Sequence, residues 1–521
     1  MQKNCACCAL ALVMMVCSTG AAKPPNIVFF LVDDMGWRDV GCFGSSFYET
    51  PNIDRFAKEG VRFTNAYAAC HVCSPTRASL MTGKYPGRLG LTDWLSGRRD
   101  FDFQHLLSAE KLQALPLEEI TLAEALKARG YRTAIFGKWH LGDGGAGPLN
   151  QGFDVQVPKW NGCCPKGGYH PPYRMAGLKI DGQEDEYLTD RLTSMALDFM
   201  EGKGDRPFFL YLSHFSVHDP IQGRKDLVEK YRAKLAKLPP LEGPPFILEG
   251  NPDDKAPLSR DQLTSLVGKP SHQAHKVLPQ RTIKIKQRQD NVEFAAMVES
   301  VDESLGRVLE KLDELGQADN TIVIFYSDNG GMSAGNFGNP TRVVPNSQLD
   351  RAYATSNLPL RGAKGWLYEG GIRVPMIVKW PGKGRAGVIC EEPVISPDFY
   401  PSILEMAGLP VKPAQHKDGK SFVPALQGRS FERGPIYWHF PHYSNHGMQS
   451  PGGAIRLGDY KLHEYFENNT VQLFNLKEDV GEQNNLAKSE PKKAAELLAL
   501  LRDWRQEVSA RMMGAKDSSG K

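Results

Sequence analysis

Residues 26–32 read Asn-Ile-Val-Phe-Phe-Leu-Val, and residues 321–326 read Thr-Ile-Val-Ile-Phe-Tyr. Both runs are continuously apolar and rich in β-branched and aromatic side chains, which is typical of strands buried on both faces. Similar runs predict strands at residues 131–136, 208–213 and 374–379, and helical patterns lie between them at residues 121–129, 190–200 and 292–315. The alternation predicts an α/β fold, in which helices sandwich a large mixed β-sheet.

The last hundred residues have a different pattern. Short antiparallel strands with tight turns are expected at residues 435–439, 454–457, 460–463 and 471–475, and a helix at about residues 492–512. We therefore expect a main α/β domain over residues 23–420 and a smaller C-terminal α+β subdomain over residues 421–521, with antiparallel strands and one helix.

An insertion interrupts the main domain at about residues 237–289. It is rich in Pro and Gly at first, and between residues 269 and 289 it carries six Lys or Arg and two His but no acidic residue. Two interpretations stay open: a solvated surface excursion, or a basic patch that meets anionic substrates.

Composition excludes several classes of protein. The chain has 521 residues, of which 24% are charged and 41% hydrophobic, and a formal net charge of +3. Disordered, collagen-like and coiled-coil proteins need far more skewed compositions, and generic nucleic-acid binding needs a larger basic excess. The expectation is a globular protein with no nucleic-acid partner, whose oligomeric state the sequence leaves open.

The first 22 residues have the pattern of a signal peptide, with Lys3, an uncharged run over residues 5–17 and the small residues Gly20-Ala21-Ala22. The apolar run is too short to cross a bilayer, so no transmembrane anchor is expected. We predict an exported protein, periplasmic or secreted, or in a lysosome-like compartment of a eukaryote. The six cysteines after residue 22 leave room for one or two disulfides.

Polar side chains follow several predicted strands directly. Asp33-Asp34 end the first strand, Asp328-Asn329 end the strand at 321, Lys138 and His140 follow the third run, and His218 follows the strand at 208. Ligands of open α/β sheets bind beyond the carboxyl ends of the strands, so these side chains are expected to converge. The carboxylates and the amide among them offer only oxygen ligands, which suit Ca²⁺ or Mg²⁺ better than zinc.

The most specific motif covers residues 73–83, Cys-Ser-Pro-Thr-Arg-Ala-Ser-Leu-Met-Thr-Gly. It resembles the signature of the type I sulfatases, which depend on formylglycine, and Lys138-Trp139-His140 resembles their second motif. Residues 328–330, 360–365 and 368–371 add further similarity, so the resemblance covers nearly the whole chain after residue 22. It implies a fold of the alkaline phosphatase superfamily.

The resemblance also implies a mechanism. A formylglycine-generating enzyme would oxidise Cys73 to formylglycine (3-oxoalanine), whose hydrate attacks the sulfur atom while Asp328 takes up the nucleophile's proton. One cation, Ca²⁺ or alternatively Mg²⁺, would be bound by Asp33, Asp34, Asp328, Asn329 and residue 73. The sulfate would lie among the catalytic residues Arg77, Lys138 and Lys364. His218, with Lys364 beside it, would protonate the leaving alcohol, and His140 would deprotonate the second hydroxyl.

Sulfated carbohydrate is the expected substrate. Residues 160–174 and 437–446 combine aromatic rings with hydrogen-bond donors, the mixture that sugars need, or else they are ordinary loop packing. The candidate substrate-binding residues there are His170, Tyr173, Arg174, His439 and His442. Two alternatives stay open: a phosphoester or phosphonate hydrolase of the same superfamily, and a non-catalytic protein that binds sulfated glycans.

Overall fold

The computed structural model describes residues 23–102, 104–178, 186–202, 204–240, 242–267, 282–335, 349–446 and 449–516. The predicted signal peptide, residues 1–22, lies outside the described residues, as does the middle of the basic insertion. No helix in the described ranges is both long and apolar enough to cross a membrane.

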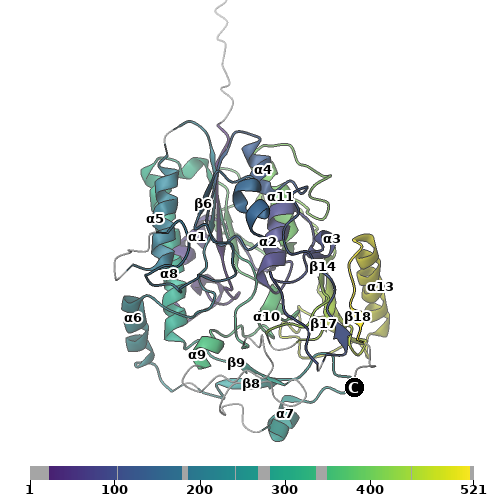
Figure 1. Ribbon diagram of the computed structural model, residues 1–521. Coiled ribbons are helices and arrows are strands. Elements are labelled where there is room, and N and C mark those ends of the chain that lie inside the picture. Colours follow the sequence, from purple (N-terminus) through teal and green to yellow (C-terminus); the bar gives the residue numbers. More distant parts are fainter. Residues whose placement is uncertain are drawn as a thin grey trace, which may run out of the picture.

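An eight-stranded mixed sheet forms the centre of the molecule (Figure 1), in the order β12-β2-β11-β10-β1-β7-β5-β6. Five strands, β10, β1, β7, β5 and β6, run parallel, and β11 is antiparallel to β10. Their bounds are β1 Asn26–Val32, β2 Val61–Phe63, β5 Arg132–Gly137, β6 Val155–Val157, β7 Phe208–Ser213, β10 Thr321–Ser327, β11 Met376–Lys379 and β12 Ile389–Cys390. The predicted α/β sandwich with a mixed sheet is confirmed.

Helices cover both faces of this sheet, and a separate apolar core fills each side. One side carries α1 Pro51–Glu59, α5 Leu188–Met200, α6 Lys225–Leu235 and α8 Val292–Glu314. The other side carries α2 Cys73–Thr82, α4 Leu122–Lys127, α11 Phe399–Met406 and α12 Val423–Leu426. All seven residues of β1 and of β10 are buried, as their uninterrupted apolar sequences predict.

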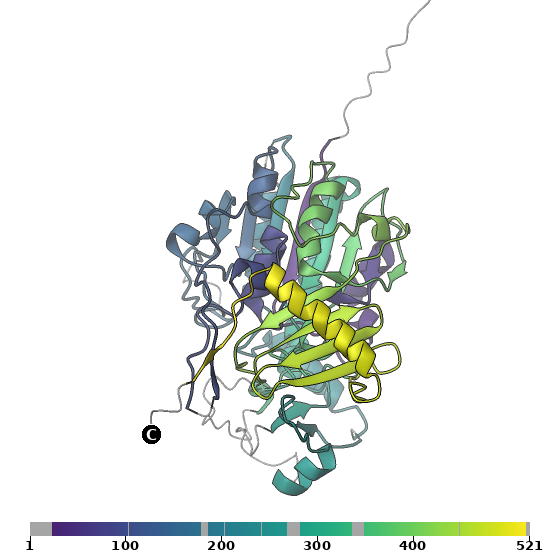
Figure 2. The same cartoon turned by 90° about the vertical axis from the view of Figure 1, so that its right-hand side faces the viewer.

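A second, antiparallel sheet follows in the C-terminal part, in the order β14-β15-β16-β17. Its strands are β14 Ile436–Phe440, β15 Gly452–Leu457, β16 Tyr460–Tyr465 and β17 Thr470–Asn475, and α13 Pro491–Glu507 lies across it (Figure 2). The helix ends before the predicted residue 512, because Ser509 adopts a left-handed backbone with φ 51°.

A buried ionic network joins this sheet to the main domain. Lys461 Nζ on β16 lies 2.9 Å from Glu369 Oε1 and 3.0 Å from Glu482 Oε1, and all three side chains are fully buried. Glu369 begins α10, Glu369–Ile372, which follows the loop that carries Lys364. The C-terminal sheet therefore supports one wall of the site described below.

The described part of the insertion forms a small hairpin of β8 Phe246–Glu249 and β9 Ile283–Lys286, with α7 Arg260–Val267 beside it. Lys284 and Lys286 are 5% and 4% exposed, and Lys286 pairs with Asp290 at 2.8 Å. These two lysines pack into the structure and belong to no exposed basic patch.

Candidate active site

Two strand ends of the main sheet bring carboxylates and an amide together. β1 and β10 are parallel neighbours, so Asp33 and Asp34 emerge beside Asp328 and Asn329. The backbone N–H of Asp34 donates to Asp328 Oδ1 at 3.1 Å, and Asn329 Nδ2 donates to Asp34 Oδ1 at 2.8 Å. All four side chains are buried. The convergence expected from the sequence is present.

Arg77 lies in the first turns of α2 and connects the carboxylates to the neighbouring strands. Its Nε and Nη2 both lie 2.8 Å from Asp328 Oδ2, and its Nη1 donates to Ser213 Oγ at 2.6 Å. Burial alone would lower the pKa of this guanidinium, but the charges of Asp328 and Asp33 raise it. Arg77 is therefore a permanent buried positive charge.

Two lysines from distant parts of the chain complete the charge balance. Lys138 Nζ donates to Asp33 Oδ2 at 2.7 Å, and Lys364 Nζ donates to Asp34 Oδ2 at 2.5 Å. Three buried carboxylates thus face three buried cations. A divalent cation added to this set would leave an excess positive charge, which suits an anionic ester.

Cys73 opens the ten-residue helix α2, whose residues are all buried. Helix N-termini attract anions, because their first N–H groups lack helical partners. Cys73 Sγ lies 3.2 Å from His140 Nδ1, and His140 Nε2 lies 2.6 Å from the carbonyl oxygen of Leu95. The carbonyl contact requires Nε2 to carry the proton, so Nδ1 is a free acceptor towards residue 73.

Burial, reinforced by the charge of Lys138, holds the pKa of His140 well below its usual value, so the imidazole is neutral. Its backbone has φ 57°, and that of Asp34 has φ 64°. Non-glycine residues rarely adopt this left-handed conformation, and such strain concentrates at functional sites.

His218 differs from His140 in its charged surroundings and in the direction of its pKa shift. Its Nδ1 lies 2.8 Å from Asp219 Oδ1, and its Nε2 lies 3.6 Å from Asp34 Oδ2. Burial lowers the pKa of His218, but the negative charges of Asp34, Asp219 and Asp33 together outweigh it and raise the pKa to about 9. The side chain is therefore a proton donor at neutral pH.

The site has unused oxygen atoms that suit a hard cation. Asp33 Oδ1 and Asn329 Oδ1 are both buried and accept no hydrogen bond. Buried oxygens without partners are costly, and a bound cation removes that cost. Ligand atoms of Asp33, Asp34 and His218 also lie within 4.8 Å of one another. Ca²⁺ and Mg²⁺ prefer oxygen ligands to imidazole, so the oxygen donors are the better ligand set for either cation.

The five sugar-binding candidates have their contacts elsewhere. His170 Nε2 lies 3.1 Å from the carbonyl oxygen of Gly223, and Tyr173 is buried in the apolar core. Arg174 is exposed. His439 Nε2 lies 2.8 Å from the carbonyl oxygen of Arg511, and His442 Nε2 lies 2.8 Å from Thr92 Oγ1. Among the contacts of the described residues, none joins these five side chains to the carboxylates.

Three residues of the site were missed in the sequence analysis. Ser213 accepts from Arg77, Asp219 pairs with His218, and His446 lies against the loop of Lys364. The direct sequence His218-Asp219 was a usable signal for the second of these. Nothing local marked the other two, because their roles depend on contacts between distant segments.

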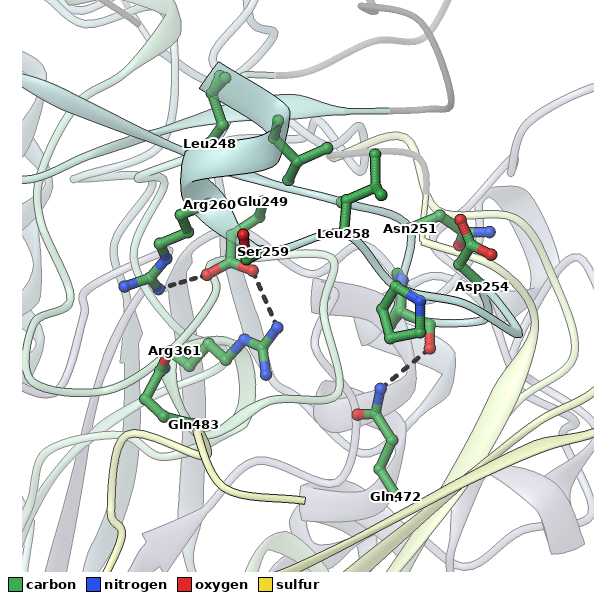
Figure 3. A pocket seen from close by; sticks show the side chains of 14 residues that line it. Leu248, Glu249, Asn251, Asp254, Leu258, Ser259, Arg260, Arg361, Gln472 and Gln483 are labelled. Carbon is green, nitrogen blue, oxygen red and sulfur yellow. Dashed lines mark hydrogen bonds and ion pairs between the residues drawn. The ribbon is translucent and has the colours of Figure 1, made fainter. Parts of the chain in front are cut away.

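A polar pocket of about 350 Å³ lies between the insertion and the C-terminal sheet (Figure 3). At its wall Glu249 accepts from Arg260 at 2.5 Å and from Arg361 at 2.9 Å. Arg361 is three residues before Lys364, so this pair of contacts ties the insertion to the loop that carries Lys364.

Comparisons with known proteins identify the family of the chain. Residues 25–409 match the sequence profile of the sulfatase family, and residues 363–509 match that of the C-terminal region of N-sulphoglucosamine sulphohydrolase. The chain belongs to the sulfatase family, and it is accordingly a hydrolase of sulfate esters.

Individual relatives are similar over most of their length. A sulfatase of Formosa agariphila is 30% identical, with 93% of this chain and 89% of the relative covered. N-acetylgalactosamine-6-sulfatase of Mus musculus is 31% identical, with 90% and 78% covered. The crystal structure of Ps i-CgsB in complex with k-i-k-neocarrahexaose is 26% identical, with a TM-score of 0.69 and 95% and 96% covered.

All six cysteines of the described part are free thiols, contrary to the expectation of one or two disulfides. Cys73 is among them, and burial raises the pKa of its thiol to about 11. An unmodified Cys73 would therefore be protonated and a poor nucleophile at neutral pH. The unmodified side chain thus does not supply the reactive group that a hydrolase needs.

Proposed function

We propose that this sulfatase is exported and removes sulfate from sulfated saccharides, using formylglycine made from Cys73 and one bound Ca²⁺. The observation that carries the proposal is the position of Cys73. It lies at the N-terminus of a buried helix, 3.2 Å from a neutral histidine and within a cluster of three cations and three carboxylates.

Asp33, Asp34, Asp328 and Asn329 would hold the cation, which supplies positive charge towards the sulfate oxygens. Hydrated formylglycine supplies an oxygen nucleophile and a second hydroxyl on the same carbon. The other functions belong to side chains of this chain. Arg77, Lys138 and Lys364 are fixed by carboxylates and present positive charge without rearrangement, which is how preorganised sites stabilise transferring anionic groups.

The two histidines divide the proton transfers because their environments differ. His140 is neutral, and its Nδ1 faces residue 73, so it takes up a proton from that residue. His218 is protonated near neutral pH and faces Asp34 and Lys364, so it donates a proton to the departing alcohol. Such separation of pKa values assigns base and acid within one site.

The saccharide assignment is supported by a relative. Ps i-CgsB, 26% identical to this chain, was solved with a neocarrahexaose bound. Export rests on the pattern of residues 1–22 and stays a prediction.

The test is turnover by protein matured with a formylglycine-generating enzyme. Sulfate release should be measured on a panel of sulfated monosaccharides and glycosaminoglycan fragments, with 4-nitrophenyl sulfate and 4-nitrophenyl phosphate as references. We expect release from at least one saccharide, and peptide mass spectrometry should find an aldehyde at position 73. An intact cysteine in active protein would refute the formylglycine. Faster turnover of the phosphate would favour the phosphoester alternative.

A further inference from the structure

His446 is a buried histidine that no proposed step uses. It lies in the segment between β14 and β15, in the C-terminal part of the chain, and is 4% exposed. Its backbone packs directly on Gly365, since a Cβ added there would come within 2.4 Å of His446 Cβ. Gly365 follows Lys364, so His446 lies against the loop that places Lys364 on Asp34.

Charged groups of the site act on the buried ring of His446. The charges of Lys364, Asp34, Asp219 and His218 all act on its pKa. These are the groups on the leaving-alcohol side of the proposed reaction. A residue from the C-terminal part of the chain thus belongs to the surroundings of these groups.

Both ring nitrogens of His446 lack a hydrogen-bond partner. A buried donor and a buried acceptor left unpaired are costly, so their presence beside the site calls for an explanation. His416 is an instructive contrast. It is also buried without partners on its nitrogens, but it packs on Tyr400, and no charged group of the site acts on its pKa.

We propose that His446 is a substrate-binding residue that hydrogen-bonds a sugar hydroxyl next to the sulfate ester. The inference rests on the proposed saccharide substrate and makes it more specific. Burial, reinforced by Lys364, lowers the pKa of His446 to about 3, so the imidazole is neutral and offers one donor and one acceptor. A hydroxyl group has the same pair of functions. A second sulfate or a carboxylate offers acceptors only, which a neutral ring satisfies less well.

The test measures binding, so that it does not depend on turnover. Full-length Cys73→Ala protein loaded with Ca²⁺ is titrated calorimetrically with a panel of monosaccharide sulfates and with inorganic sulfate. His446→Phe keeps the ring shape without nitrogens, His446→Gln keeps one donor and one acceptor, and His416→Phe is the matched control. We expect His446→Phe to weaken binding of the preferred sugar sulfate about 10-fold to 100-fold, because the sugar hydroxyl is then buried without its hydrogen-bond partner. His446→Gln should recover most of this loss. His416→Phe should bind the sugar sulfate as the parent does, and all the variants should bind inorganic sulfate equally well.

A deoxy analogue of the sugar, which lacks the hydroxyl beside the sulfate, tests whether His446 acts on that hydroxyl. The parent protein should bind it more weakly than the full sugar, whereas His446→Phe should bind both equally. Should His446→Phe fail to fold, His446→Met, which also lacks a hydrogen-bond donor, takes its place in the same comparison. Equal binding of the full sugar by the parent and His446→Phe would overturn the role of His446 alone. A parent that binds inorganic sulfate but none of the sugar sulfates would overturn the saccharide assignment as well.

Discussion

Lys364 Nζ lies 2.5 Å from Asp34 Oδ2, although 330 positions separate the two residues in the chain, and both side chains are buried. The contact places a positive charge beside a proposed metal ligand and against the position of the ester. It requires the loop that carries Lys364 to lie against the end of β1. The final assembly of the site therefore depends on the packing of the C-terminal sheet.

Removing the charge of Lys364 should impair catalysis more than folding. We expect Lys364→Met to lower kcat/KM for 4-nitrophenyl sulfate about 100-fold to 1,000-fold, because one preorganised charge is lost from the transferring group. Lys364→Arg should retain part of the activity. The control is Lys379→Met, which removes a partly exposed lysine paired with Glu59 at 2.7 Å. Equal losses in Lys364→Met and Lys379→Met would contradict the catalytic role.

Asp34→Ala should remove the bound cation. Asp34 is held between Asn329 and Lys364, and its loss leaves a hard cation without one of its few carboxylate ligands. Elemental analysis of purified protein should find about one Ca²⁺ per chain in the parent and far less in the variant. Asp302→Asn changes a buried carboxylate that binds the N-terminus of α1, and it should keep the cation. Unchanged metal content in Asp34→Ala would refute the ligand assignment.

Cys73→Ser should separate the two halves of the reaction. A serine at this position keeps one oxygen nucleophile beside Arg77 and Lys138 but lacks the second hydroxyl that His140 would deprotonate. We expect about one turnover per chain and a stable covalent sulfate on residue 73, the mark of nucleophilic catalysis with a blocked second step. Intact-mass analysis after addition of substrate checks this. Repeated turnover without an adduct would instead favour direct attack by water.

The pH dependence of kcat should follow the protonation of His218, which Asp219 influences. Burial lowers the pKa of His218, but Asp34, Asp219 and Asp33 together raise it to about 9, so the donating, protonated form is present below that pH and is lost above it. The kcat for a sulfated sugar should therefore fall as the pH rises through about 9. Asp219→Asn removes a negative charge and should move this fall to lower pH.

A good leaving group needs no proton, so 4-nitrophenyl sulfate supplies the control. The kcat for this substrate should decrease much less at high pH, both in the parent and in Asp219→Asn. The same fall for both substrates would show that His218 does not act as the acid.

The buried network of Lys461 should matter for stability. Lys461→Met leaves Glu369 and Glu482 buried without their shared cation, which typically costs about 3–5 kcal/mol. Thermal unfolding should show a clearly lower Tm for Lys461→Met. Lys493→Met, which removes an exposed pair with Glu496, should leave the Tm nearly unchanged. A Tm equal to that of the parent in Lys461→Met would contradict the network's role.

The sequence by itself determined the central sheet and the composition of the proposed catalytic cluster. Uninterrupted apolar runs at β1 and β10 specify strands buried on both faces, and polar residues after parallel strands must meet at one edge. Asp33, Asp34, Asp328 and Asn329 were therefore predictable together. Residues 73–83 were predictable for a different reason, because they resemble the signature motif of the type I sulfatases.

Only the tertiary structure decided which side chains of the loops reach the site. Residues 437–446 have the same aromatic and histidine-rich composition throughout, yet His439 and His442 bond elsewhere while His446 packs against the loop of Lys364. Lys284 and Lys286, basic in sequence, are buried in the hairpin of the insertion. Local pattern fixes periodicity and residue type, whereas burial and charge pairing arise from contacts between distant segments. Those contacts also set the pKa values that distinguish His140 from His218.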